Sequence, residues 1–134
     1  MVKHVILWTL KEEFDEKQKA EIKKGIKEGL EGLFGKIPGL TEIKVYTEGL
    51  ASSNADLMLD STFESAEALK GYAVHPDHVA VADGKVRPFT ATRSCLDFEI
   101  WFLFPTSREL NKDYVEFLLN GVINLWYVSN CLKR

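Results

Sequence analysis

The sequence predicts an α+β protein whose strands and helices follow one another in the order βαββαβ. Three observations lead to this fold class. Apolar and polar residues alternate with period two over 2–10, 41–48, 56–63 and 92–104, which is typical of strands with one buried face. A long segment of helical period, 16–34, follows the first strand, and two shorter helical segments precede the last strand. This order is the ferredoxin-like plan, in which helices cover one face of an antiparallel sheet.

The first strand and the helix after it carry clear local signals. One face of the strand holds His4, Ile6, Trp8 and Leu10. Asp15 and Gln18 have the spacing of a capping box, which starts the helix at about Glu16. The apolar stripe of the helix, which we expect to lie on the sheet, is made of Ile22, Ile26, Leu30 and Leu33. Gly25, Gly29 and Gly32 flank the stripe. A glycine inside a helix costs up to about 1 kcal/mol relative to alanine, so they predict either close backbone packing or a pocket wall.

Turn and cap residues separate the remaining elements. Pro38 and Gly39 form a turn before the second strand, and the polar stretch 51–54 joins the second and third strands as a hairpin. Ser65 is placed to cap a short helix over 66–72. Pro76 then begins a second short helix that extends to about Val86, because proline is accepted in a first helical turn.

Composition excludes several classes of function and location. Seventeen Lys and Arg stand against twenty Asp and Glu, so the net charge of -3 provides no basic field for nucleic acid. Two cysteines, Cys95 and Cys131, fit a reducing compartment better than a disulfide scaffold. The strand position of Cys95 predicts a buried, inert thiol. The start of the chain lacks the pattern of a signal peptide, and we expect a cytoplasmic protein.

Residues 105–134 follow the predicted domain, 1–104, as a separate segment. Apolar side chains between 114 and 126 give a broad helical face, interrupted by Asn120 and Asn124. The interruption makes the segment a poor membrane span. We expect this tail either to contact another subunit or to be foreign to the domain.

Tyr72, His75 and His78 form the candidate chemical site. With Pro76 at the start of a helix, His75 falls at its N-cap and His78 in its first turn, where the positive helix end disfavours a charged imidazole. A neutral imidazole acts as a base, and a nearby phenol hydrogen-bonds to a developing oxyanion. His4 adds a third polar group on the first strand.

Each of these residues also has a purely structural interpretation. His75 is a helix cap in that interpretation, His78 a satisfied core group and Tyr72 a packed aromatic ring. We expect no metal, because Pro76 breaks the register between His75 and His78 and zinc needs three or four convergent ligands. No glycine-rich phosphate loop lies between a strand and a helix, and we expect no cofactor.

Several segments in this order resemble the stress-responsive A/B barrel domains, or Dabb proteins, which are dimeric α+β barrels. The segments are Lys3-His4-Val5-Ile6, Ile37-Pro38-Gly39-Leu40, 56–65 and His75-Pro76-Asp77-His78-Val79. The resemblance covers about residues 1–100 and implies a homodimer whose sheets pair into one barrel. It also implies a pocket between sheet and helices. Tyr72 and His78 match the acid–base pair of a plant polyketide cyclase of the family, and His4 matches a pocket histidine. Ile6, Trp8 and Leu59 match pocket walls, whereas Leu57 replaces a further pocket histidine.

Two functions follow from this sequence. One is a homodimeric protein that binds a small apolar, oxygen-bearing molecule, with His78 and Tyr72 catalysing cofactor-independent aldol or enol chemistry as a cyclase-like lyase. His4, Ile6, Trp8, Leu59 and His75 would bind the substrate. The alternative is a non-catalytic stress or assembly protein in which the same residues are structural. Cofactor-free oxygenation rests on fold analogy alone.

Overall fold

The computed structural model describes residues 1–100 and confirms the βαββαβ order. The strands are β1 (Val2–Leu10), β2 (Leu40–Tyr46), β3 (Leu57–Phe63) and β4 (Thr90–Glu99). The helices are α1 (Glu16–Glu31), α2 (Ala66–Val74) and α3 (Pro76–Val81), the last continued by the π-helical turn η1 (Ala82–Val86). Within residues 1–100, no helix is both long and apolar enough to cross a bilayer. The predicted helical tail, 105–134, lies outside the described residues.

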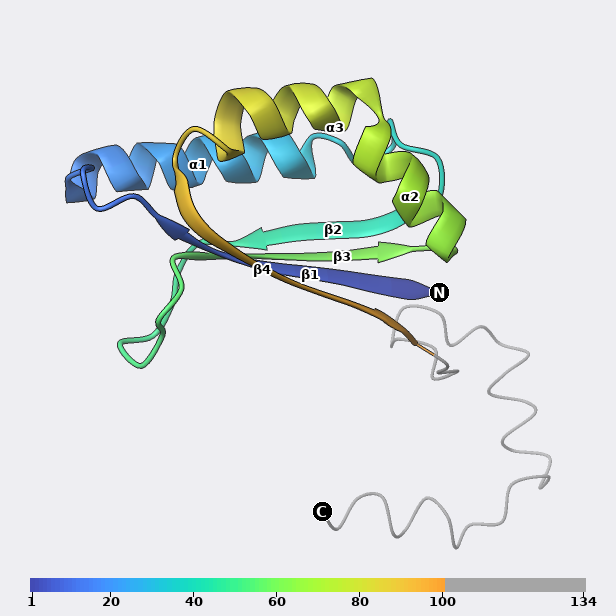
Figure 1. The fold of residues 1–134 in the computed structure, drawn as a ribbon, viewed down its shortest axis with the longest axis horizontal. Coiled ribbons are helices and arrows are strands. Elements are labelled where there is room, and N and C mark those ends of the chain that lie inside the picture. The colour runs from blue at the N-terminus through green and yellow to red at the C-terminus, as the bar shows by residue number, and fades with distance from the viewer. Residues whose placement is uncertain (101–134) are drawn as a thin grey trace, which may run out of the picture. The chain divides into compact units, whose positions relative to one another are not determined.

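The four strands form one antiparallel sheet in the order β2-β3-β1-β4. The helices lie over one face of this sheet (Figure 1). Ile6 of the central strand β1 is in register with Leu59 of β3 on one side and with Cys95 of β4 on the other. Side chains alternate between the faces, so these residues and their neighbours at every second position face the helices. The fold is therefore ferredoxin-like, as the sequence predicts.

Helix α1 begins where the sequence predicts and ends earlier. The Asp15 carboxylate accepts from the Gln18 N–H and the Gln18 side chain accepts from the Asp15 N–H, which completes the capping box. The predicted apolar stripe faces the core, with Ile26, Leu30 and Leu33 buried. After Glu31 the backbone bonds tighten into turns, and Gly35 takes a positive φ of 80°, so the helix does not reach residue 34.

Two polar side chains of α1 satisfy the free edge of β2. The Lys27 ammonium donates to the Val45 carbonyl at 2.7 Å, and the Val45 N–H donates to the Glu31 carboxylate at 2.9 Å. Lys27 and Glu31 also pair with each other at 2.7 Å. Unpaired groups on an edge strand otherwise invite pairing with another chain. The helix thus protects this edge.

Close packing explains one of the three helical glycines. A Cβ on Gly29 would lie 3.0 Å from side-chain atoms of Val81 and Lys85, so α1 and the α3–η1 segment approach closely there. Gly25 has open space around it and borders a separate hollow together with Phe14 and Phe89. Gly32 follows the last residue of α1 as its C-cap, and none of the three glycines lines the cavity described below. Elsewhere, Gly39 has a φ of 77° and lies against Ala68 of α2, where a Cβ would come within 2.5 Å of the Ala68 Cβ.

The second half of the domain differs from the prediction at its boundaries. Helix α2 runs two residues further than predicted, and the last turn of the next helix is π-helical, with the Arg87 N–H donating to the Ala82 carbonyl. Strand β4 begins two residues earlier than predicted, at Thr90, and ends at Glu99. It starts early because its first residues pair with the end of β1. Residues 101–104 of the predicted strand lie outside the described residues.

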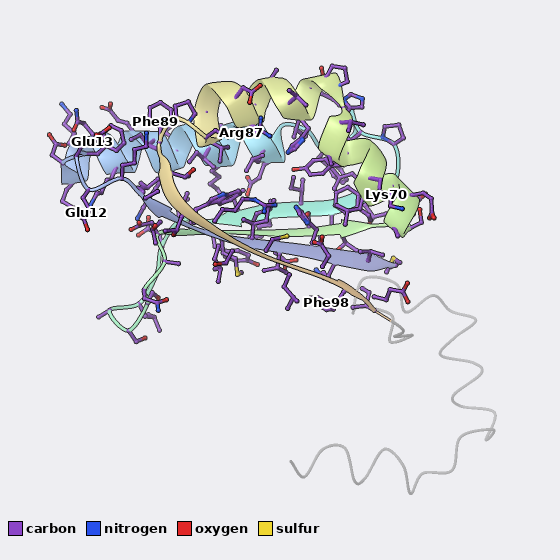
Figure 2. The ribbon with its side chains drawn as sticks, in the orientation of Figure 1. Glu12, Glu13, Lys70, Arg87, Phe89 and Phe98 are labelled. Carbon is purple, nitrogen blue, oxygen red and sulfur yellow. The ribbon has the colours of Figure 1, made fainter. Side chains whose placement is uncertain are left out.

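The sheet face opposite the helices carries apolar side chains without cover from the described residues. Leu7, Tyr46, Leu96 and Phe98 are each more than 40% exposed. Register places Leu7 beside Met58, and Phe98 projects away from the helices (Figure 2). Large apolar side chains gathered on one sheet face are typical of an interface.

Candidate functional site

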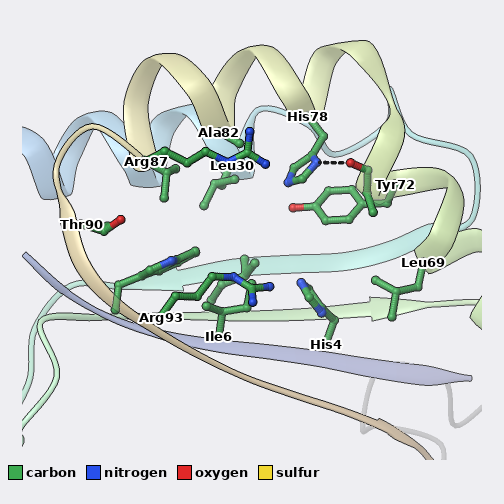
Figure 3. Close-up of a pocket in the computed structure, with 14 residues that line it drawn as sticks. His4, Ile6, Leu30, Leu69, Tyr72, His78, Ala82, Arg87, Thr90 and Arg93 are labelled. Atoms are coloured by element: carbon green, nitrogen blue, oxygen red, sulfur yellow. Dashed lines mark hydrogen bonds between the residues drawn. The ribbon is translucent and has the colours of Figure 1, made fainter.

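A cavity of about 410 Å³ lies between the sheet and the helices. Its walls come from β1, α1, β3, α2, α3, η1 and β4, so elements from the whole domain contribute. The side chains converge on one space (Figure 3). The lining residues are His4, Ile6, Trp8, Leu30, Leu59, Leu69, Tyr72, Ala73, His78, Ala82, Val86, Arg87, Thr90 and Arg93.

Tyr72 is the most enclosed polar residue of the cavity. It lies near the end of α2, and its side chain packs against Phe63 with ring centroids 5.0 Å apart. The hydroxyl group is buried and has no hydrogen-bond partner among the described residues. Burial raises the pKa of the Tyr72 phenol well above its usual range, and Arg93 opposes the shift. The phenol therefore keeps its proton and offers it to a ligand.

His78 lies directly beside Tyr72. The two ring centroids are 4.0 Å apart with the planes at 35°. The Nδ1 atom of His78 is 3.3 Å from the Ala73 carbonyl oxygen, the contact drawn as a dashed line in Figure 3. A carbonyl only accepts, so Nδ1 carries the proton and Nε2 keeps a free lone pair.

The His78 imidazole is held neutral mainly by burial. Burial lowers its pKa, the hydrogen bond to the Ala73 carbonyl raises it, and the nearby charges of Arg87 and Arg93 lower it again together with His4. The sequence predicts a neutral ring from the helix terminus, whereas desolvation is the main cause in the structure. A neutral imidazole with an open nitrogen is competent to accept a proton.

His4 enters the cavity from β1 and is held by β4. Its Nδ1 atom is 2.5 Å from the Asp97 carboxylate, which is directly opposite in register. The carboxylate orients the His4 ring, so that the Nε2 atom of His4 faces the cavity. The polar wall of the cavity also includes Tyr72. The His4 and Tyr72 rings meet edge-on with centroids 6.0 Å apart.

The structure brings six of the seven predicted site residues to the cavity. Ile6, Trp8 and Leu59 form an apolar wall beside His4, Tyr72 and His78. His75 does not reach it. Its ring instead accepts from the Asp77 N–H at 3.2 Å and caps α3, which is the structural interpretation of this residue.

Several lining residues are absent from the sequence prediction. Arg87 and Thr90 follow the π-helical turn, and Arg93 lies on β4 opposite Trp8. Arg93 and Asp97 are four residues apart on β4, so the alternation of the strand predicts that they share a face, but it does not predict which strand lies beside them. The prediction that Cys95 is buried is wrong. Its thiol is exposed, because β4 is an edge strand.

His4, Cys95 and Asp97 place three possible metal ligands within 4.8 Å of one another. The Nδ1–Oδ1 separation of 2.5 Å is that of a hydrogen bond. Two such ligands at ~2.0–2.1 Å from a tetrahedral zinc ion would lie about 3.3 Å apart. The Asp97 carboxylate would have to move away from His4 before an ion could bind between them. The hydrogen bond between His4 and Asp97 therefore explains why these side chains lie together. His75 and His78 do not converge on a common point, because one caps a helix and the other faces the cavity.

Comparisons with known proteins agree with this architecture. The family model for the stress responsive A/B barrel domain, Dabb, matches residues 2–100. No curated protein sequence matches the chain.

Solved structures share the fold at low sequence identity. A dimeric protein of unknown function with a ferredoxin-like fold from Bacteroides fragilis is 29% identical, with 74% of this chain and 95% of that chain covered and a TM-score of 0.69. A Dabb family protein from Mesorhizobium loti is 17% identical, covers 75% and 97%, and has a TM-score of 0.59. The hydroxynitrile lyase from Passiflora edulis is 20% identical, covers 78% and 96%, and has a TM-score of 0.58.

Proposed function

The chain belongs to the stress responsive A/B barrel domain family, Dabb, and we propose that it is a homodimer that binds a small oxygen-bearing molecule and catalyses acid–base chemistry on it. One observation carries the proposal. The buried Tyr72 hydroxyl has no hydrogen-bond partner within residues 1–100, and it lies at the wall of a 410 Å³ cavity directly beside a neutral His78. An unpaired buried hydroxyl costs about 1–3 kcal/mol, which a bound carbonyl oxygen would offset.

The arrangement supports aldol or enol chemistry without a cofactor. The substrate carbonyl oxygen accepts a hydrogen bond from the Tyr72 hydroxyl. The free Nε2 of His78 removes a proton from the neighbouring carbon, and the electron pair of that C–H bond forms the enolate. The enolate carbon attacks a second carbonyl of the same molecule, and the resulting alkoxide takes the proton back from the imidazolium. No oxidant, reductant or metal enters this balance.

The two groups act at different atoms and contribute separately. A positioned general base accelerates proton transfer typically by about 10²–10⁴-fold. A preorganised hydrogen-bond donor aimed at the developing oxyanion contributes about 10²–10³-fold in well-studied enzymes. His4 has the character of a positioning group, because the Asp97 carboxylate fixes its ring beside Tyr72.

Homodimer formation is supported by the free sheet face and by the relatives. The Bacteroides fragilis structure is described as dimeric. In this chain the apolar side chains Leu7, Leu96 and Phe98 stand exposed on the face opposite the helices. Pairing two such faces would remove them from water and close the sheets into a barrel. Light scattering on the full chain tests this, and a monomer at micromolar concentration would contradict it.

A histidine titration by NMR tests the site directly. We expect His78 to titrate below the usual value of about 6.5 and to shift, together with Tyr72, when an aromatic polyketide-like ligand is added. His75 serves as the internal control, because it caps a helix outside the cavity. Ordinary titration of His78 and indifference to every ligand would favour the alternative, a non-catalytic stress or assembly protein.

Turnover of a linear polyketide thioester tests the chemistry. His78→Ala and Tyr72→Phe should each lower the rate of cyclisation at least 100-fold, because each removes one of the two acting groups. His75→Asn is the matched control, since asparagine preserves the helix cap and His75 lies outside the cavity. Equal rates in all three variants would refute the assignment of the acid–base pair.

A further inference from the structure

We infer that the cavity selects an organic anion and that Arg93 holds its carboxylate group. This inference rests on the proposed function, because it names the class of molecule that the same cavity accepts. It goes beyond that function by giving the substrate a charge and a direction of binding.

The cavity is cationic, although the whole chain is acidic. The net charge of the chain is -3, yet the cavity lining from residues 1–100 includes two arginines and no aspartate or glutamate. A cleft lined by one sign of charge attracts ligands of the opposite sign.

The two arginines differ in their ionic partners within the part of the chain that the structure describes. Arg87 forms an ion pair with Asp83, four residues earlier in the chain. Arg93 forms no ion pair within residues 1–100. Asp97, on the same face of β4, accepts from His4 instead.

Arg93 lines the cavity from an exposed position on the edge strand β4. It is in register with Trp8 of β1, so its side chain leaves the sheet on the helix side. Figure 3 shows its guanidinium directed into the space below His78 and Tyr72. Its charge opposes the burial-driven rise in the pKa of Tyr72 and adds to the fall in the pKa of His78, so it lies within electrostatic reach of both groups.

The rest of the lining completes the description of the ligand. Guanidinium groups bind carboxylates through two parallel hydrogen bonds. Ile6, Leu30 and Leu59 offer an apolar wall between the two polar ends. The ligand class is therefore a small carboxylate with an aromatic or alkyl body, whose carboxylate meets Arg93 while an uncharged oxygen meets the Tyr72 hydroxyl.

A matched pair of probes separates charge from shape. We would titrate the full chain with 4-hydroxybenzoate and with its neutral analogue 4-hydroxybenzamide, following the His78 and Tyr72 ring resonances. The wild-type protein should bind the acid about tenfold more tightly than the amide, because a hydrogen bond to a charged group at a partly exposed site changes the dissociation constant by about this factor.

Two variants with the same change in charge test the residue. Arg93→Gln should abolish the preference for the acid while leaving amide binding unchanged, which also shows that the cavity remains folded. Lys70→Gln removes a positive charge from an exposed position of α2 outside the cavity. We expect this control to keep the tenfold preference.

The possible failures are distinguishable. If acid and amide bind alike, or if Arg93→Gln keeps the preference, the anion subsite is refuted and the Tyr72–His78 proposal stands. If neither probe shifts any ring resonance at millimolar concentration, the anion inference and the ligand cavity on which it rests both fall.

Discussion

Replacing Tyr72 by phenylalanine removes one hydroxyl group from the interior and keeps the ring that packs there. The side chain is 2% exposed, and its hydroxyl has no partner among the described residues. The ring contacts with Phe63 and His78 remain, so the change leaves only a small void. Leaving a buried hydroxyl unsatisfied costs about 1–3 kcal/mol. We therefore expect Tyr72→Phe to stabilise the protein by about 1–2 kcal/mol while it lowers activity.

Urea unfolding followed by tryptophan fluorescence measures this effect. All samples need one protein concentration, because the stability of a dimer depends on concentration. Ser61→Ala is the matched control, since that hydroxyl is also buried but donates to the His4 carbonyl at 3.0 Å. Its removal should destabilise the protein by about 1 kcal/mol. If Tyr72→Phe destabilises the protein as Ser61→Ala does, the Tyr72 hydroxyl has a partner and the reasoning is wrong.

Three further predictions concern the backbone, the sheet face and pH. Gly39→Ala should destabilise the protein by about 2 kcal/mol or more in the urea assay, because φ is 77° and the new methyl group would overlap Ala68 of α2. Gly71→Ala is the control. Gly71 lies within α2 with open space around it, so this change should stabilise the protein. Leu7→Asp on the free sheet face should give a monomer in light scattering. Leu50→Asp, on a loop at 82% exposure, should leave the dimer intact. If the Leu7→Asp protein is still a dimer, this sheet face is not the dimer interface. The free energy of unfolding should fall as pH drops below about 6.5, because the unfolded chain takes up a proton on His78 that the folded chain resists. His78→Gln should lose that part of the pH dependence, and an unchanged slope would show that the ring titrates normally.

Local signals were sufficient for most elements of the fold. The capping box at Asp15 and the alternation along β1 act over a few residues, so the sequence alone placed both correctly. The boundaries were less predictable. Helix α1 stops at Glu31 because the next bonds tighten into turns, and β4 begins at Thr90 because it pairs with the end of β1. The second of these causes is a contact between segments far apart in the chain.

The candidate site likewise has one part that the sequence predicts and another that depends on contacts between distant segments. Tyr72 and His78 are six residues apart across one bend, so their proximity was open to prediction from the sequence, as was the cavity-facing side of β1. The tertiary structure decided which groups complete the site. Asp97 reaches His4, and Arg93 reaches the cavity, only because β4 pairs with β1 in one register. A shift of one residue would turn both side chains to the opposite face, and no local pattern in the sequence specifies a register between segments about 90 residues apart.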